Sequence, residues 1–178
     1  MQPLTMKDFT IRTEKSADYP AVESLVYQAF LIAEQRDGTE QDLVRRLRQS
    51  TAFIPELSLV AEHDGSLVGY ILLTEVTING HKALALAPLA VAPAYQRQGI
   101  GTALIKRSHL IAQKLGYPCI IVLGSDTYYP RLGYQPAAKY GIKAPFEVPS
   151  KYYQVYPLVR NLTEISGTVA YAPEFDLN

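Results

Sequence analysis

The spacing of apolar residues along the chain predicts an alternation of strands and helices. Residues 9–12 alternate between apolar and polar, which is typical of a short strand with one buried face. Asp18 and Pro20 then stand where the cap and the first turn of a helix are expected. The buried stripe of this helix is predicted from apolar residues at helical spacing: Val22, Leu25, Val26, Ala29 and Phe30.

A second helix is predicted after Gly38, which interrupts the first apolar pattern. Thr39 and Asp42 resemble a capping box at its start. Its expected buried positions are Leu43, Val44 and Leu47, and its expected exposed positions are Arg45, Arg46 and Arg48. We interpret the three arginines as a solvated helix face, in preference to an anion site.

Two dipeptides, Asp64-Gly65 and Asn79-Gly80, divide the middle of the chain into three strand-like runs. The runs cover residues 57–63, 67–78 and 81–91. Asp-Gly and Asn-Gly tolerate the positive φ angles of two-residue hairpin turns. The sequence therefore predicts three antiparallel strands joined by two tight hairpins.

The third of these strands, residues 81–91, contains an internal proline. The run is apolar almost throughout, as expected of a strand covered on both faces, and Pro88 interrupts it. Because proline cannot donate a hydrogen bond to the ladder, the strand should be bulged or unpaired at Pro88. Two interpretations remain open: a kink needed for packing, or a strand that parts from its neighbour so that a ligand can bind.

A helix and a further strand follow this meander. Apolar residues recur at helical spacing after Gly101 until Gly116 ends the pattern, and residues 119–123 form a short apolar run. A strand, a helix and a strand of these lengths imply a right-handed crossover and a parallel pair. We therefore predict a mixed α/β fold with a mostly antiparallel sheet and one parallel β-α-β unit, with strand-like stretches also near residues 152–158 and 167–171.

Composition and charge narrow the classes of protein that fit. The 178 residues suit a single domain, residues 1–178, and 48% of them are apolar and 19% charged. Lysine plus arginine and aspartate plus glutamate both number 17, so a nucleic-acid partner is not expected. One cysteine and three histidines are a poor set of metal ligands, so no metal is expected. With no signal sequence at the start and no run of 18 apolar residues, we expect a cytoplasmic protein without a membrane partner.

The segment Gln96-Arg97-Gln98-Gly99-Ile100-Gly101-Thr102 is the strongest candidate for ligand binding. It lies between a predicted strand and the start of a helix, where unpaired N–H groups and the helix dipole attract an anion. Glycines at 99 and 101 let the backbone approach a bulky anion. A phosphate-binding G-x-x-x-x-G-K-[ST] loop does not occur, and Leu104 stands where a dinucleotide fingerprint needs its third glycine. A glycine-rich turn that binds nothing stays open as an alternative.

Four segments resemble one family. The string Q-x-x-G-x-G at residues 96–101, after a strand ending in Leu89-Ala90-Val91, resembles the acetyl-CoA signature of the GNAT N-acetyltransferase superfamily. Residues 11–30 resemble its first strand and helix, and residues 128–134 resemble its Y-x-x-x-G-[FY] segment. The tail at 166–171 is similar to the YhbS-like branch of acetyltransferases. The first three segments cover roughly residues 9–135 in the order of the family fold.

The resemblance implies a GNAT fold and acetyl-CoA as co-substrate. An acetyl group would pass to a primary amine of a small molecule or peptide, which attacks directly in a ternary complex. The resemblance further implies that the N–H of Val91 lies near the thioester carbonyl. The residues that it assigns to the co-substrate are Leu89, Ala90, Val91, Gln96, Arg97, Gln98, Gly99, Ile100, Gly101 and Thr102.

Tyr129 is the expected general acid. It stands four residues before Gly133, where family members often carry the tyrosine that protonates the departing thiolate. Tyr128 would replace it if the register differs by one residue. A packing role for Tyr129 is the alternative, because the chain has 13 tyrosines.

The general base is less clearly marked. Many relatives carry a glutamate six residues before the position of Val91, where this chain has Ala85. Glu75 on the neighbouring strand is the best carboxylate candidate, with His81 second. Cys119 begins a buried strand and is expected to be inert, although an acyl-cysteine mechanism stays open as an alternative.

The acceptor wall is expected from residues Phe30–Arg36 and the loop Ala137–Lys151. Four aromatic side chains there either favour an aromatic or apolar acceptor or cover the core: Tyr140, Phe146, Tyr152 and Tyr153. The missing carboxylate at position 85 leaves a second hypothesis, a non-catalytic acyl-CoA-binding module or sensor. A nucleotide-binding enzyme is a third hypothesis. A homodimer through the C-terminal edge strands is compatible with the resemblance.

Overall fold

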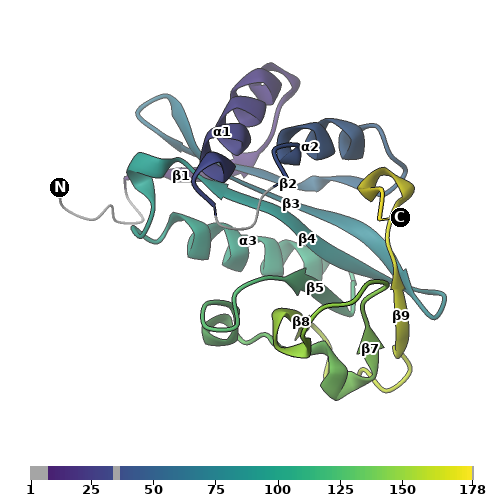
Figure 1. Cartoon of the computed structure of the whole chain (residues 1–178). Coiled ribbons are helices and arrows are strands. Elements are labelled where there is room, and N and C mark those ends of the chain that lie inside the picture. Colours follow the sequence, from purple (N-terminus) through teal and green to yellow (C-terminus); the bar gives the residue numbers. More distant parts are fainter. Residues whose placement is uncertain (1–7, 34–36, 178) are drawn as a thin grey trace.

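The computed structural model describes residues 8–33 and 37–177 (Figure 1). Its three α-helices in these ranges are α1 Tyr19–Leu31, α2 Glu40–Arg48 and α3 Ile100–Lys114. The strands are β1 Thr10–Thr13, β2 Phe53–His63, β3 Ser66–Ile78, β4 His81–Val91, β5 Cys119–Leu123, β6 Gln135–Pro136, β7 Ile142–Lys143, β8 Tyr153–Pro157 and β9 Gly167–Ala170. Short 3-10 helices occupy Ser16–Asp18, Pro93–Tyr95, Tyr129–Leu132, Ala137–Tyr140, Ser150–Tyr152 and Pro173–Phe175.

The strands form one mixed sheet in the order β1-β2-β3-β4-β5-β8-β6. Neighbours in this order are antiparallel except β4 and β5, which are parallel and joined through α3. The predicted fold class is therefore confirmed. Near the C-terminus, β9 pairs antiparallel with the far end of β3 and also holds the short strand β7 in a parallel pair, a pairing that the sequence analysis did not predict.

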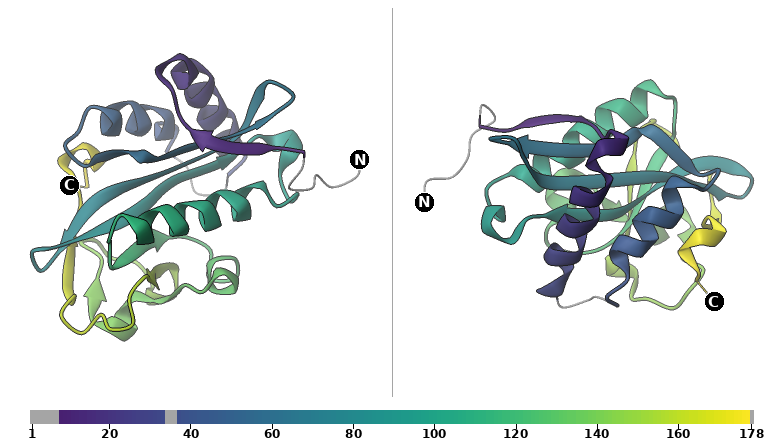
Figure 2. Two further views of the ribbon diagram at one scale, coloured as in Figure 1. Left: turned by 180° about the vertical axis from the view of Figure 1, so that it is seen from behind. Right: turned by 90° about the horizontal axis from the view of Figure 1, so that it is seen from above.

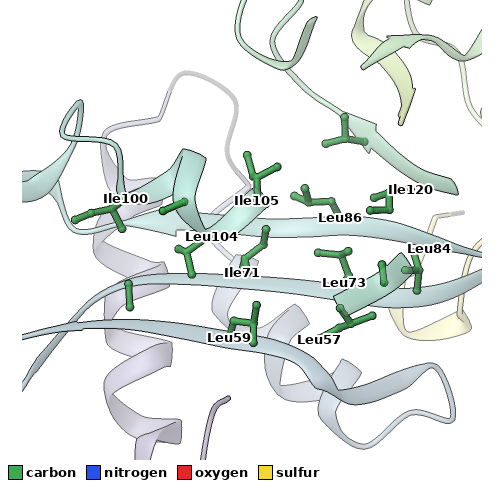
Figure 3. Close-up of a cluster of buried hydrophobic side chains, with 14 of the residues drawn as sticks. Leu57, Leu59, Ile71, Leu73, Leu84, Leu86, Ile100, Leu104, Ile105 and Ile120 are labelled. Carbon is green, nitrogen blue, oxygen red and sulfur yellow. The ribbon is translucent and has the colours of Figure 1, made fainter. Parts of the chain in front are cut away.

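Helices cover both faces of the central strands. In Figure 2, α3 runs along one face of the sheet, and α1 and α2 lie on the opposite face. On the α3 face, Ile71 of β3 and Leu104 of α3 are fully buried in one apolar cluster with Leu59 and Leu84 (Figure 3). On the other face, Val26 of α1 and Leu47 of α2 are completely buried. Burial of such side chains contributes about 1.5–3 kcal/mol each, so these two layers fix the sheet between the helices.

The two hairpins are confirmed. β2, β3 and β4 follow one another as an antiparallel meander. Asp64 and Gly65 have φ angles of 49° and 78°, and Asn79 and Gly80 have 51° and 78°. Two consecutive positive φ angles are the geometry that Asp-Gly and Asn-Gly accept at low cost.

The helix caps differ from the prediction. Asp18 stands at the start of α1, but its carboxylate accepts two hydrogen bonds from the Arg12 guanidinium, at 2.7 and 3.0 Å, and makes no cap. Thr39 precedes α2, and its hydroxyl donates to Asp37 Oδ1 at 2.6 Å instead of capping the helix. Asp18 and Thr39 thus each form a hydrogen bond with another side chain and not with an N–H group of the helix that follows.

The predicted solvated face of α2 is wrong at Arg48. Arg45 and Arg46 are exposed, whereas the Arg48 side chain is only 5% exposed. Its guanidinium forms ion pairs with Glu14 and, at 3.1 Å, with Glu23. A buried charge of this kind must be paired, and the partners come from segments far away in the sequence.

Candidate active site

Strand β4 is bulged at Pro88, as predicted. Leu89 lies opposite Ile71 of β3 and Leu86 lies opposite Leu73, so two residues of β4 stand against one residue of β3. On its other side β4 pairs with β5 at only two positions, Leu84 and Ala85. Beyond Ala85 the two parallel strands diverge.

The backbone of β4 presents N–H groups to the side from which β5 has diverged. The N–H of Ala92 donates to the carbonyl of Val68 on β3 at 2.9 Å. Because successive N–H groups of a strand point to opposite sides, that of Ala90 also faces β3. The N–H groups of Leu89 and Val91 therefore face away from β3.

The start of α3 supplies a second set of donors. Gly99 precedes the helix with a φ angle of 89°, and its carbonyl accepts the first helical hydrogen bond, from Ala103 at 3.0 Å. The N–H groups of Ile100, Gly101 and Thr102 have no acceptor within the helix and point out of its first turn. Together with the helix dipole they form an anion site.

These two sets of donors line one depression, which we call the α3 cleft, with a volume of about 350 Å³. Its lining residues are Leu89, Val91, Tyr95, Gln96, Arg97, Gly99, Ile100, Gly101, Thr102 and Tyr128. Eight of the ten residues expected to bind the co-substrate thus lie in its wall. Ala90 does not, because its side chain packs on the opposite face of the sheet, and neither does Gln98.

The structure of the α3 cleft shows what Gln96 contacts and how much space surrounds Gly101. The Gln96 side chain donates to the carbonyl of Val91 at 3.2 Å and so ties the loop to β4. A Cβ atom at Gly101 would lie 3.4 Å from the Tyr128 hydroxyl and 3.6 Å from Val91. Any side chain at position 101 would therefore project between these residues, into the α3 cleft.

The two adjacent tyrosines occupy different surroundings. The Tyr128 hydroxyl lies 2.9 Å from the Thr102 hydroxyl, at the anion-binding end of the α3 cleft. Tyr129 is buried, and its ring packs so closely on Gly124 that a Cβ there would approach it to 2.5 Å. Gly124 directly follows β5, so the Tyr129 ring lies next to the end of β5 that has diverged from β4.

The Tyr129 hydroxyl is a weaker acid than that of an exposed tyrosine because of its burial. Burial, followed by the neighbouring Tyr128, raises the pKa of Tyr129 above its ordinary value. The hydroxyl is therefore protonated throughout the neutral range. Within residues 8–33 and 37–177 the hydroxyl makes no hydrogen bond, and Tyr129 is not among the residues that line the α3 cleft.

Glu75 is not brought to this site. It stands opposite Leu84 on β4 and therefore shares the sheet face of α3. The Tyr117 hydroxyl donates to its carboxylate at 2.7 Å, and Lys82 lies 3.7 Å away. His81 is exposed at the distant hairpin.

Cys119 is buried, and burial raises the pKa of its thiol to about 12. A thiol of that pKa is protonated and unreactive at neutral pH. The expectation that Cys119 is inert agrees with these surroundings.

A second hollow, which we call the β4–β5 cavity, opens where the two strands part and has a volume of about 220 Å³. Its lining residues are Leu43, Ala85, Leu86, Ala87, Ile121, Leu123, Phe146, Tyr171, Phe175 and Leu177. Of the acceptor wall predicted from residues 137–151, only Phe146 takes part, while Tyr140 and Tyr153 pack in the core. The other predicted wall, Phe30–Arg36, contributes none of these residues, and positions 34–36 of it lie outside the described residues.

The C-terminal segment of the β4–β5 cavity was not predicted. Tyr171, Phe175 and Leu177 come from the tail, which lies beside α2 (Figure 1). The Arg46 guanidinium of α2 donates to the Glu174 carbonyl at 3.1 Å and holds the tail there. The sequence feature that could have indicated this contribution is the presence of these three large apolar residues close together in the tail.

The described residues contain no group of three histidine, cysteine, aspartate or glutamate side chains placed to hold a metal ion. Among their helices, none combines the length and apolar character needed to cross a membrane.

Comparison with known proteins identifies the family. Residues 55–136 match the model of the acetyltransferase (GNAT) domain. The uncharacterized N-acetyltransferase YjhQ of Escherichia coli K12 is 34% identical over 154 residues, which cover 84% of this chain and 82% of YjhQ. The chain belongs to the GNAT acetyltransferase family.

Solved GNAT structures support the assignment and the resemblance to the YhbS-like branch. The structure of YhbS from Escherichia coli, in complex with CoA, has a TM-score of 0.87 and 27% identity and covers 99% of this chain and 95% of YhbS. A GNAT acetyltransferase from Brucella melitensis, in complex with acetyl-CoA, has a TM-score of 0.80 and 29% identity and covers 94% of this chain and 98% of that protein. This GNAT protein is accordingly an acetyltransferase with the fold described above.

Proposed function

We propose that this GNAT acetyltransferase transfers the acetyl group of acetyl-CoA to a primary amine, which attacks directly in a ternary complex. The observation that carries the proposal is the position of the two hollows on one strand. The α3 cleft contains Leu89 and Val91, and the β4–β5 cavity contains Ala85 and Ala87. Pro88 lies between them, so a donor in the cleft and an acceptor in the cavity would meet at the bulge.

The α3 cleft suits acetyl-CoA. Its pyrophosphate would accept hydrogen bonds from the N–H groups of residues 100–102, and its pantetheine arm would run beside residues 89–91 of β4. The similar proteins from Escherichia coli and Brucella melitensis are bound to CoA and acetyl-CoA in their structures. The exposed Arg97 side chain would add positive charge near the phosphates.

The reaction requires an oxyanion donor and an acid. The amine nitrogen attacks the thioester carbon, and the carbonyl oxygen gains negative charge near the N–H groups of Leu89 and Val91. Of these two, Leu89 adjoins Pro88 and lies nearer the β4–β5 cavity, while Val91 remains the predicted donor. The carbon–sulfur bond then breaks, and the CoA thiolate takes the proton of Tyr129, which solvent replaces. The attacking nitrogen releases its own proton to water.

Tyr129 and Tyr128 form a matched pair for testing this assignment. We expect Tyr129→Phe to lower kcat about 100-fold, the usual size of a general-acid contribution, and to leave acetyl-CoA binding unchanged. Tyr128→Phe should weaken acetyl-CoA binding severalfold with little change in kcat, because its hydroxyl lies at the anion end of the cleft. Calorimetric titration and initial rates separate the two effects. Unchanged turnover in Tyr129→Phe would remove Tyr129 as the acid.

A non-catalytic acyl-CoA-binding module is the second candidate. It is favoured by the absence of any carboxylate or histidine among the described residues that line the β4–β5 cavity. Acetyl-CoA binding without turnover across a broad amine panel would support this module and contradict the enzyme.

We also propose that residues 1–178 act as one acetyltransferase domain. β9, near the end of the chain, pairs with Thr77 and Ile78 of β3, in the middle of the sheet. The tail further supplies three residues to the β4–β5 cavity. Removal of the segment after residue 165 should therefore destabilise the whole fold, as followed by thermal unfolding.

A further inference from the structure

The β4–β5 cavity is apolar almost throughout. Tyr171 is the one lining residue, in the described part of the chain, whose side chain carries a heteroatom. Its hydroxyl is 2.8 Å from that of Tyr153 and is thus already partnered. Leu123 and Leu177, at 48% and 45% exposure, carry the apolar surface out to solvent.

The charged groups on the surrounding elements lie outside this lining. Arg46 on α2 donates a hydrogen bond to the Glu174 carbonyl. Asp176 and Glu147 line other hollows of the surface. The carboxylate of Glu174 is likewise not part of the lining, although Phe175 beside it is. In the described residues no charged side chain therefore belongs to the lining of the β4–β5 cavity, although one Glu174 carboxylate oxygen is buried next to it without a hydrogen-bond partner.

Tyr171 is not a substitute for a base. Burial raises its pKa to about 12, although the hydrogen bond with Tyr153 acts in the opposite direction. At neutral pH it is a neutral phenol, and its conjugate base is too scarce to accept the proton of an ammonium ion.

An alkylammonium ion would meet two obstacles in the β4–β5 cavity. Its transfer from water into an apolar hollow without a counter-charge is unfavourable by several kcal/mol. It must also lose a proton before its nitrogen can attack, and the lining offers no acceptor. An aromatic amine avoids both obstacles, because its nitrogen is uncharged at neutral pH and its ring matches Phe146, Phe175 and Tyr171.

Accepting the proposed function, we propose that the acceptor is a neutral aromatic amine, bound with its ring in the β4–β5 cavity and its nitrogen toward Pro88. Ala85 is part of the same specialisation. The resemblance places a glutamate there in many relatives, whereas the small side chain here widens the apolar floor and supplies no base.

The test compares two acceptors of similar size, para-anisidine and para-methoxybenzylamine, at saturating acetyl-CoA. Release of the CoA thiol gives the rate, corrected for the reaction without enzyme. We expect kcat/KM to favour para-anisidine by about 100-fold and to stay flat between about pH 6 and pH 9, since neither the acceptor nor an enzymic base titrates there. For para-methoxybenzylamine the rate should rise with pH as the free amine forms.

Three other results would overturn either the aromatic-amine assignment or the proposed function. Equal or greater kcat/KM for para-methoxybenzylamine overturns the aromatic-amine assignment. Turnover of neither amine, with acetyl-CoA binding intact, also overturns it but leaves the donor site in place. Failure to bind acetyl-CoA overturns the proposed function itself.

Two charge-introducing variants sharpen the test. Ala85→Glu should raise KM for para-anisidine about tenfold and improve the relative use of para-methoxybenzylamine, because a carboxylate would then face the ammonium. Since Ala85 is buried and this variant can misfold, Leu123→Glu at the half-exposed rim should shift the preference in the same direction. Glu174→Gln is the matched control and should leave both rates unchanged. A large loss in Glu174→Gln would reveal a carboxylate base and overturn the inference.

Discussion

The α3 cleft and the β4–β5 cavity lie on the same strand but are built in opposite ways. Apart from Tyr128, the cleft comes from one continuous segment, residues 89–102, and the donors expected to hold the co-substrate include backbone N–H groups of β4 and of the first turn of α3. The cavity gathers side chains from α2, β4, β5, a loop and the tail, and Tyr171 is the one polar side chain among its described lining residues. Backbone groups can thus bind the same donor, acetyl-CoA, in many proteins of a family, because they do not depend on side-chain identity. The choice of acceptor depends on the side chains that line the cavity.

The largest effect is expected where a side chain enters the α3 cleft. Gly101→Val would place methyl groups between Leu89, Val91 and Tyr128, where the pantetheine arm is proposed to lie. We expect acetyl-CoA affinity to fall by at least about 100-fold, equivalent to about 2.8 kcal/mol. Calorimetry measures the loss, and far-ultraviolet circular dichroism checks the fold. Unchanged affinity would place the arm elsewhere.

A smaller effect should distinguish the two ends of α3. Gly99 and Gly116 flank the helix with φ angles of 89° and 86°, and a Cβ at either would meet no atom within 4 Å. Alanine at each position should therefore lower the free energy of unfolding by a similar amount, about 1 kcal/mol. Gly99→Ala alone should also weaken acetyl-CoA binding severalfold, because it disturbs the anion site. Equal acetyl-CoA affinity in the two variants would contradict the position of the phosphates.

The smallest effect is expected in the β4–β5 cavity. Tyr171→Phe removes the hydrogen bond to Tyr153, at a cost of about 1 kcal/mol in unfolding free energy, while the apolar wall stays in place. KM for para-anisidine should change less than about threefold. Tyr153→Phe removes the same hydrogen bond from outside the cavity lining and should cost the same stability. If kcat collapses in Tyr171→Phe alone, its hydroxyl takes part in the reaction.

The same contrast explains what could be predicted from the sequence. The hairpins at Asp64-Gly65 and Asn79-Gly80, the bulge at Pro88 and the glycine-rich turn before α3 depend on local backbone preferences, which the sequence shows directly. Eight of the ten expected co-substrate residues accordingly lie in the α3 cleft.

Features that depend on distant partners could not be predicted. Burial of Arg48 depends on Glu14 and Glu23, which precede it by more than 20 residues. Alternation places Glu75 on the same face as Ile71 and Leu73, but the contacts of its carboxylate with Tyr117 and Lys82 depend on how the chain folds. The contribution of Phe175 to the cavity depends on how the tail packs against α2.

A crystal structure of the protein with bound acetyl-CoA would test directly whether donor and acceptor meet at Pro88. We expect the thioester oxygen within about 3 Å of the N–H of Leu89 or Val91, with the acetyl methyl group directed past Pro88 into the β4–β5 cavity. An acetyl group bound away from β4, or separated from the β4–β5 cavity by hydrogen bonds between β4 and β5, would contradict the proposed mechanism.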